Sequence, residues 1–384
     1  MKIINFFRKK IIIKKIEKVD VLLLDNNFAK LKFNNLKYAA VNFDEINLWC
    51  LAICIRNFFS IFSKKISIKE LYFKVLFELY SPKIVIDSNI RYWGWMCKKL
   101  FKKTKTIIYQ HSFLYDYEKD DYKKIFANKE SDFYVSFDKM HTNFFSSIIK
   151  SNFLQYGSVL NNEIILNKCE KIYPIMYISE FRGYISSNAR GYDGKKKHYF
   201  GQLQAIKYLK TFCEKEKIKP QIGLMSYRQS VKSTGLRYEG QLIYNSEIYL
   251  QKEIRFYEEN LKNFSYEKNS SIYTASKSNV IICLGSNLGI ELLSRGFKVL
   301  FLNILGELDK KYTSPYFVEE SCPCFVRNVN SKEVFDRINL FLKMSDSEWE
   351  KIFLNIKNKM FFDVGNSLLK KKINSIIKNR NLVN

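Results

Sequence analysis

The sequence predicts an α/β protein built from two Rossmann-like domains that face a cleft. Short apolar runs of strand length alternate with helical stretches through most of the 384 residues, as in doubly wound parallel sheets. The runs fall into two successive series, and 47% of the residues are hydrophobic, enough for two cores. We therefore expect an N-terminal domain over residues 1–165 and a C-terminal domain over residues 166–384.

The first series is expected to form the strands of the N-terminal domain. These strands are residues 19–25, 83–87, 106–111, 133–137 and 153–157, with helices at 43–62, 69–80 and 92–101. Asp87 and His111 end two of them, and open α/β sheets bind ligands beyond the carboxyl ends of their strands. His111 could orient or deprotonate a hydroxyl group, whereas Asp87 could act as a base or cap the next helix. His141 is expected on a surface helix.

The second series is expected to form the C-terminal domain. Its strands are residues 174–179, 221–226, 280–284 and 298–303, its helices are 201–217 and 246–263, and residues 183–197 should be a loop. Ser345 and Glu348 form a capping box that opens a late helix through residue 358. Glu180 follows the first strand and is a candidate base. Arg228 lies just beyond the second strand and could add positive charge.

The most informative segment is a strand–turn–helix–strand unit over residues 278–303. Gly285, Ser286 and Asn287 form the turn, and a helix of about two turns follows. Ser286 or Asn287 can cap this helix, and Gly285 and Gly289 leave room for a ligand to approach the backbone. Free amides at a helix N-terminus favour a phosphate, but such turns also occur for structural reasons alone. These residues therefore leave open whether the turn binds a phosphate.

The residues from Ser286 to Glu291 read Ser-Asn-Leu-Gly-Ile-Glu, and Ser-Arg-Gly at 294–296 precedes a Lys-Val strand. This wording resembles bacterial surface-carbohydrate biosynthesis proteins, of capsule and lipopolysaccharide, with a GT-B-like fold. In that family the turn is of the Ser-Thr-Leu-Gly-Tyr-Glu type and the helix closes with Ala-Arg-Gly. Asn287 and Ile290 depart from the family pattern. The Gln110-His111 dipeptide also resembles a block of that family.

The resemblance implies a glycosyltransferase that needs no metal ion or other cofactor. The C-terminal domain would bind a nucleotide-sugar donor, and a CMP-linked acidic sugar fits a basic cleft. The N-terminal domain would hold a glycan or a lipid-linked saccharide as acceptor. The donor-binding residues would be Arg228, Gly285, Ser286, Asn287, Gly289 and Glu291, the last through a ribose hydroxyl. Glu253 and Tyr257, on one helix face, would support the pocket from behind.

The formal net charge of +26 indicates acidic partners. The lysines are spread along the whole chain together with abundant Asn and Ile, as an AT-rich coding bias would also produce. They form no recognised nucleic-acid module, so we expect no nucleic-acid partner. Attraction to anionic sugar nucleotides or lipids explains the positive net charge equally well. Eight scattered cysteines, no signal peptide and no apolar run near ~20 residues favour a cytoplasmic protein associated peripherally with the inner face of the cytoplasmic membrane.

Three other functions stay open on the sequence. A UDP-sugar epimerase shares the two-domain fold, and a CDP-polyol phosphotransferase would use the same phosphate-binding turn. A basic, non-catalytic scaffold of a polysaccharide assembly complex is the non-enzymatic alternative. The sequence has no Gly-x-Ser-x-Gly elbow, no Walker A loop and no Asp-x-Asp pair, which argues against a serine hydrolase, a P-loop ATPase and a metal-dependent GT-A transferase.

Overall fold

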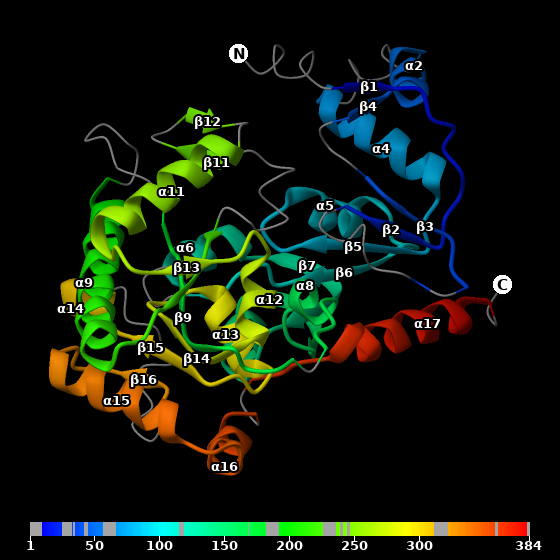
Figure 1. Cartoon of the computed structure of the whole chain (residues 1–384). Helices are drawn as coiled ribbons and strands as arrows, with labels where there is room; N and C mark the ends of the chain where they lie inside the picture. Colours follow the sequence, from blue (N-terminus) through cyan, green and yellow to red (C-terminus); the bar gives the residue numbers. More distant parts are fainter. Residues whose placement is uncertain are drawn as a thin grey trace. The chain divides into compact units, whose positions relative to one another are not determined.

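The chain divides into two compact α/β units (Figure 1). The computed structural model describes residues 10–24, 33, 35–41, 45–56, 67–114, 119–167, 169–181, 192–225, 236–238, 241–243, 246–310, 322–357 and 360–381. Unit 1 comprises Met1–His111, Phe126–Ile164 and Asp363–Asn384, and unit 2 comprises Ser112–Ile125 and Ile165–Phe362. Each unit contains a six-stranded parallel sheet, so the predicted class, two Rossmann-like domains, is confirmed.

The sheet of unit 1 has the order β3-β2-β5-β6-β7-β8. Its strands are β2 (Val21–Leu23), β3 (Tyr38–Ala40), β5 (Ile84–Ser88), β6 (Lys105–Tyr109), β7 (Lys129–Ser136) and β8 (Ile149–Gln155). Its larger helices are α4 (Ile68–Tyr80), α5 (Tyr92–Leu100), α7 (Lys139–Ser146) and α17 (Ser367–Asn381), with the short α8 (Val159–Asn162) and η6 (Val364–Asn366). A separate two-stranded sheet pairs β1 (Lys10–Ile12) with β4 (Glu45–Asn47), and α2 (Leu48–Arg56) follows β4 directly.

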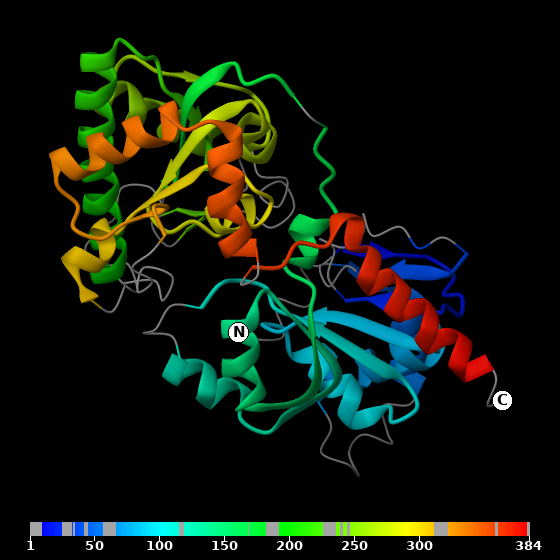
Figure 2. The ribbon, with the colours of Figure 1, turned by 90° about the horizontal axis from the view of Figure 1, so that it is seen from below.

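Side-chain alternation along β2 and β5 divides the core of unit 1 between two faces of the sheet. Leu22 and Val85 pack with α4 and α5 on one face. Val21 and Ile84 pack on the other face with Leu369, Ile373 and Ile377 of α17. Figure 2 shows α17 running across this sheet.

Asn366 anchors the start of α17. Its side-chain nitrogen donates to the Val159 carbonyl at 2.8 Å and to the Glu163 carboxylate at 2.9 Å. The backbone of Asn366 has φ 52°, a left-handed conformation that asparagine tolerates better than most residues. We expected the C-terminal helices to belong to the second domain, whereas the contacts of α17 place it in unit 1.

The sheet of unit 2 has the order β13-β10-β9-β14-β15-β16. Its strands are β9 (Tyr173–Ile178), β10 (Gln221–Gly223), β13 (Ser265–Tyr266), β14 (Ser278–Cys283), β15 (Val299–Leu302) and β16 (Phe325–Val326). Its helices are α9 (Tyr192–Glu216), α11 (Ser246–Asn260), α12 (Ser271–Ser276), α13 (Asn287–Ser294), α14 (Ile304–Leu308), α15 (Ser331–Lys343) and α16 (Asp346–Lys357). In chain order the strands read 3-2-1-4-5-6, the order of a dinucleotide-binding Rossmann sheet.

The remaining elements are α6 (Lys119–Phe126) and a hairpin of β11 (Leu236–Tyr238) with β12 (Gln241–Ile243). All nine predicted strands are present with shifted ends, and the capping box at Ser345 forms as predicted. The bounds of two predicted elements were wrong. Residues 183–197 were expected to be a loop, but α9 begins at Tyr192. The helix expected over residues 43–62 begins only at Leu48, because β4 precedes it.

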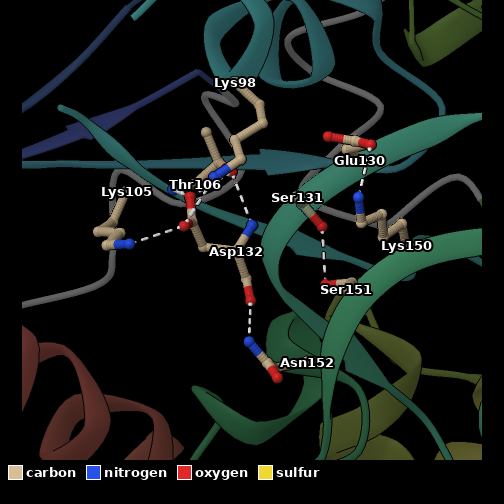
Figure 3. Close-up of polar contacts among 9 residues, drawn as sticks. All are labelled: Lys98, Lys105, Thr106, Glu130, Ser131, Asp132, Lys150, Ser151 and Asn152. Carbon is tan, nitrogen blue, oxygen red and sulfur yellow. Dashed lines mark hydrogen bonds and ion pairs between the residues drawn. The ribbon is translucent and has the colours of Figure 1, made fainter. Parts of the chain in front are cut away.

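An ion-pair network holds the amino-terminal edge of the unit 1 sheet (Figure 3). Asp132 of β7 accepts hydrogen bonds from Lys98 Nζ at 2.8 Å and from Lys105 Nζ at 2.9 Å through Oδ1. Its Oδ2 accepts from the Thr106 amide at 3.0 Å. Burial by itself raises the pKa of Asp132, but the hydrogen bonds from the two lysines and Thr106 outweigh it, so the pKa is lowered overall.

We expect Ile373→Ala to lower the free energy of unfolding by about 2–5 kcal/mol, because it leaves a cavity under α17. Urea denaturation followed by tryptophan fluorescence measures the loss. Asn374→Ala, at the next and exposed position, should stay within about 0.5 kcal/mol of the parent. Equal stability of Ile373→Ala and the parent would contradict the assignment of α17 to the unit 1 core.

We expect Asp132→Asn to cost about 1–3 kcal/mol of stability at pH 7. Because folding lowers the pKa of Asp132, its contribution is present above the unfolded-state pKa of about 4 and is lost as pH falls through the lower folded-state pKa. Denaturant melts of parent and variant from pH 7 to pH 3 should therefore converge. Glu130→Gln, in the exposed pair with Lys150 of the same figure, is the control and should change stability by less than about 1 kcal/mol. A pH-independent gap would refute the ionic explanation.

Candidate functional site

The strand order of unit 2 indicates a candidate ligand site at the carboxyl ends of β9 and β14. The chain runs outward from β9 through β10 to β13 and then returns to β14 on the other side of β9. The connections from β9 and β14 therefore leave the sheet in opposite directions, so the sheet has its topological switch point between these two strands. In open α/β sheets ligands bind at such a switch point.

Glu180 lies at this switch point, two residues beyond β9. Its side chain is buried, and its Oε1 accepts hydrogen bonds from the Leu284 amide at 3.2 Å and the Gly285 amide at 3.0 Å. The carboxylate thus ties the end of β9 to the turn that follows β14. This geometry suits Glu180 to position the turn, and its role as a base stays a proposal.

The turn leads into α13, whose first residue is Asn287 and whose N-cap is Ser286, one of the two caps expected. Ser286 is buried and makes no capping hydrogen bond to the first turn of the helix. Asn287 is half-buried. Because α13 follows β14 directly, its N-terminus lies at the carboxyl edge of the sheet. The positive end of the helix dipole there favours a negatively charged group.

Gly289 has a packing role. A Cβ atom at this position would lie 2.5 Å from Cys283 Sγ and 3.1 Å from Phe301 Cε1. The space that we expected a ligand to use is therefore filled by side chains of β14 and β15, so this expectation was wrong for Gly289. Burial, with the nearby Glu180 carboxylate, raises the pKa of the Cys283 thiol well above its usual range. The thiol is thus neutral, as packing against α13 requires.

Glu291 lies one turn into α13, four residues before Arg295. Burial lowers the pKa of Arg295 to about 10, although the nearby Glu291 and Tyr273 favour its charged form. The Arg295 guanidinium lies 4.3 Å above the Phe362 ring, a cation–π geometry. Glu291 thus has a cationic neighbour at the C-cap of its own helix, and its assignment to a ribose hydroxyl stays a proposal.

A second buried carboxylate supports the same edge of unit 2. Glu253 of α11 accepts hydrogen bonds from the Ser179 hydroxyl and from the Met225 amide, the latter at 2.9 Å. One turn later, the Tyr257 hydroxyl accepts from Gln202 at 3.0 Å. Burial, followed by the nearby Glu253, raises the pKa of Tyr257 well above its usual range. The helical spacing indicated that Glu253 and Tyr257 share a face, but it did not indicate their partners.

The side chain of Asp87 in unit 1 accepts a hydrogen bond from the first turn of a helix. Its Oδ1 accepts from the Ser88 amide at 2.9 Å, and its Oδ2 accepts from the Gly94 amide in the first turn of α5 at 2.7 Å. The carboxylate is fully buried, and a Cβ atom at Gly94 would lie 2.6 Å from Asp87 Cβ. This geometry favours helix capping, one of the two roles expected, and gives no support to Asp87 as a base.

His111 follows β6 at the carboxyl edge of the unit 1 sheet and is half-buried. Its backbone amide donates to Asn89 Oδ1 at 3.1 Å, and Asn89 Nδ2 donates to the Tyr134 hydroxyl at 3.0 Å. Three neighbouring strands thus hold its backbone, and among the described candidates for a base it is the most exposed.

His141 was expected on the surface of a helix, and this prediction was wrong. It lies in α7 but is buried, and its Nδ1 is 2.8 Å from Oδ2 of Asp138, the N-cap of that helix. The Asp138 carboxylate also accepts from the His141 amide at 2.8 Å. The Asp-x-x-His spacing was the available signal, because an N-cap aspartate faces the third residue of its helix. Arg228 lies outside the described residues.

Comparisons with known proteins agree with this fold. A family assigned to O-antigen biosynthesis matches residues 110–377. A structure assigned as a UDP-N-acetylglucosamine 2-epimerase from Listeria monocytogenes superposes with a TM-score of 0.51 at 9% identity, covering 96% of this chain and 98% of that one. The wall teichoic acid polymerase TagF, solved with CDPG, gives 0.50 at 12% identity, covering 96% and 90%. A search of curated protein sequences finds no match.

These structural matches, far below 25% identity, establish the fold alone. With two Rossmann-like units, the chain has the GT-B fold. None of the helices in the described part of the chain is long and apolar enough to cross a bilayer.

We expect Gly289→Ala to destabilise the protein by up to about 2 kcal/mol. The steric cost of about 1–3 kcal/mol exceeds the gain in helix propensity of about 1 kcal/mol. Thermal or urea unfolding measures the change. In a Cys283→Ala background the same substitution should cost clearly less, because Cys283 Sγ is the nearest atom to the new methyl group. An equal cost in both backgrounds would argue against this packing.

Proposed function

Because the chain belongs to this family of O-antigen biosynthesis proteins, we propose that it is a glycosyltransferase of bacterial surface polysaccharide assembly. Unit 2 binds a nucleotide-activated sugar at the switch point between β9 and β14, and unit 1 binds a glycan or lipid-linked saccharide acceptor. The protein acts at the inner face of the cytoplasmic membrane. The observation that carries the proposal is the turn after β14, which Glu180 holds through the Leu284 and Gly285 amides.

The proposed reaction requires that the negative charge of the leaving group be stabilised. Transfer of a sugar leaves a phosphate or diphosphate group behind, and stabilising that charge lowers the barrier. We infer that the first-turn amides of α13, with the Ser286 hydroxyl and the Asn287 amide, receive this group. Arg228 is proposed to add a positive charge. The transfer needs no metal ion in this scheme, because helix amides and basic side chains neutralise the leaving group.

The acceptor hydroxyl must lose a proton as the new glycosidic bond forms. His111 is the base that we propose, because it follows β6 at a sheet edge and is more exposed than Asp87 or Glu180. Glu180 acts as a positioning residue for the turn, and Asp87 for α5. Glu291 is proposed to bind a ribose hydroxyl of the donor.

The test is a thermal-shift screen of the purified protein against CMP, CDP, UDP, GDP and ADP. A ligand at 100 times its dissociation constant adds about 2.7 kcal/mol of stability, so the nucleotide of the donor should raise the unfolding midpoint by several degrees. A donor that binds should also be consumed with release of its nucleotide when acceptor glycan is supplied. An epimerase would instead interconvert the sugar and keep the nucleotide attached.

We expect Ser286→Ala/Asn287→Ala to lower nucleotide affinity at least tenfold while the protein stays folded. The matched control is Asn330→Ala/Ser331→Ala, which changes the same residue types at the N-terminus of α15 in the same unit. The control should lose part of its helix cap, about 1 kcal/mol, but keep the full nucleotide shift. Undiminished binding by the first variant would refute the assignment of the donor site.

A further inference from the structure

Helix α2 exposes three of its large apolar side chains. Leu48, Trp49 and Ile55 are 41%, 59% and 64% exposed, whereas Cys50 and Cys54 are buried. At 100° per residue, the three exposed side chains share one side of the helix and the two cysteines lie opposite. Cys50 and Cys54 pack on the unit 1 core, so the opposite, exposed side of α2 is also apolar and has no covering layer in the described part of the chain. A helix that is apolar all round normally lies in a core or in a membrane.

Two more apolar side chains are exposed in and just after β1, the strand that pairs with β4 immediately before α2. Ile11 and Ile13 are 61% and 76% exposed. Asn47 joins this segment to α2, because its Nδ2 donates to the Lys14 carbonyl at 2.7 Å and its Oδ1 accepts from the Trp49 amide at 3.0 Å. Figure 1 shows β1, β4 and α2 gathered at one end of unit 1. We call Ile11, Ile13, Leu48, Trp49 and Ile55 the α2 surface.

Basic side chains lie among these apolar residues in the sequence. Within residues 11–18 and 45–56, the exposed charged residues are Lys14, Lys15, Lys18, Arg56 and Glu17. Positive charge therefore dominates this segment, and the hydrogen bond from Asn47 to Lys14 places it beside the start of α2.

We propose that the α2 surface docks the protein on a bilayer that contains anionic phospholipid. Lysine is depleted from protein–protein interfaces, so a second protein is a poorer fit to this combination. Exposed tryptophan and aliphatic side chains beside lysines are the features of an interfacial membrane contact, in which the apolar groups enter the headgroup region and the lysines attract anionic lipid. The surface does not involve the nucleotide site. The membrane proposal rests on the proposed function only because a lipid-linked acceptor would lie in the same membrane.

Trp49 provides a direct probe of this contact. The chain has four tryptophans, and Trp93, Trp95 and Trp349 are 8%, 6% and 6% exposed. Adding phosphatidylcholine vesicles with 30% phosphatidylglycerol to the full-length protein should therefore shift the emission of Trp49 to shorter wavelength and protect it from iodide quenching. Vesicles of phosphatidylcholine alone should give a much weaker effect. Trp49→Phe should still bind the vesicles but lose the shift.

Co-sedimentation with the same vesicles tests the residues. Trp49→Ser/Ile55→Ser should bind at least tenfold more weakly, and Lys14→Gln/Lys15→Gln about thirtyfold more weakly. The matched controls are Leu340→Ser/Leu354→Ser, at positions 47% and 53% exposed in unit 2, and Lys102→Gln/Lys103→Gln, both exposed. Both controls should bind like the parent.

Equal loss in tests and controls, or no binding of the parent to anionic vesicles, would overturn the proposal. So would a parent dimer in solution that Trp49→Ser/Ile55→Ser dissociates, because the α2 surface would then join two copies of the chain. The nucleotide thermal shift, run on the same variants, keeps the two proposals apart. Lost vesicle binding with an unchanged nucleotide shift supports the membrane surface, and a missing nucleotide shift in the parent sinks only the donor site.

Discussion

The hydrogen bonds that Leu284 and Gly285 donate to Glu180 join two strands at the point where the chain of unit 2 reverses its direction across the sheet. Parallel order 3-2-1-4-5-6 requires β9 and β14 to be neighbours whose following segments diverge. A buried carboxylate between them satisfies two backbone amides and fixes the start of α13. The geometry of the proposed donor site depends on this contact, because the helix N-terminus can receive a phosphate only if the turn before it is held.

Buried carboxylates serve the backbone throughout this molecule. Asp87, Asp138, Glu180 and Glu253 each accept hydrogen bonds from main-chain amides at helix starts or strand ends. Asp132 differs, because two lysines also bind it. The whole chain has 64 Lys and Arg against 38 Asp and Glu, which gives a formal excess of 26 positive charges. That excess suits a protein whose proposed partners, a nucleotide-sugar and an anionic membrane, both carry negative charge.

The return of the chain to unit 1 has a thermodynamic reason. One face of β2 and β5 is covered by α4 and α5, which are close in sequence, while the other face needs an apolar partner. Helix α17 supplies it with Leu369, Ile373 and Ile377. Unit 1 is therefore completed only by the last segment of the chain. A boundary drawn from the order of strands alone places this helix in the wrong half.

The sequence by itself determined nine strands of the two large sheets and the class of fold, because buried parallel strands are short apolar runs that local patterning reveals. The strands β3, β13 and β16, of two or three residues each, were not predicted, since they are too short to form such a run. The sequence also determined the capping box at Ser345 and the start of α13, since both depend on residues within one turn of each other. The tertiary structure decided which polar residues are free to act. The Asp87 carboxylate accepts a hydrogen bond from the Gly94 amide, and His141 is buried against Asp138. The space beside Gly289 is filled by the side chain of Cys283, from the preceding strand. Such outcomes depend on which side chains fill the space when strands and helices pack. Spacing along the chain does not contain that information.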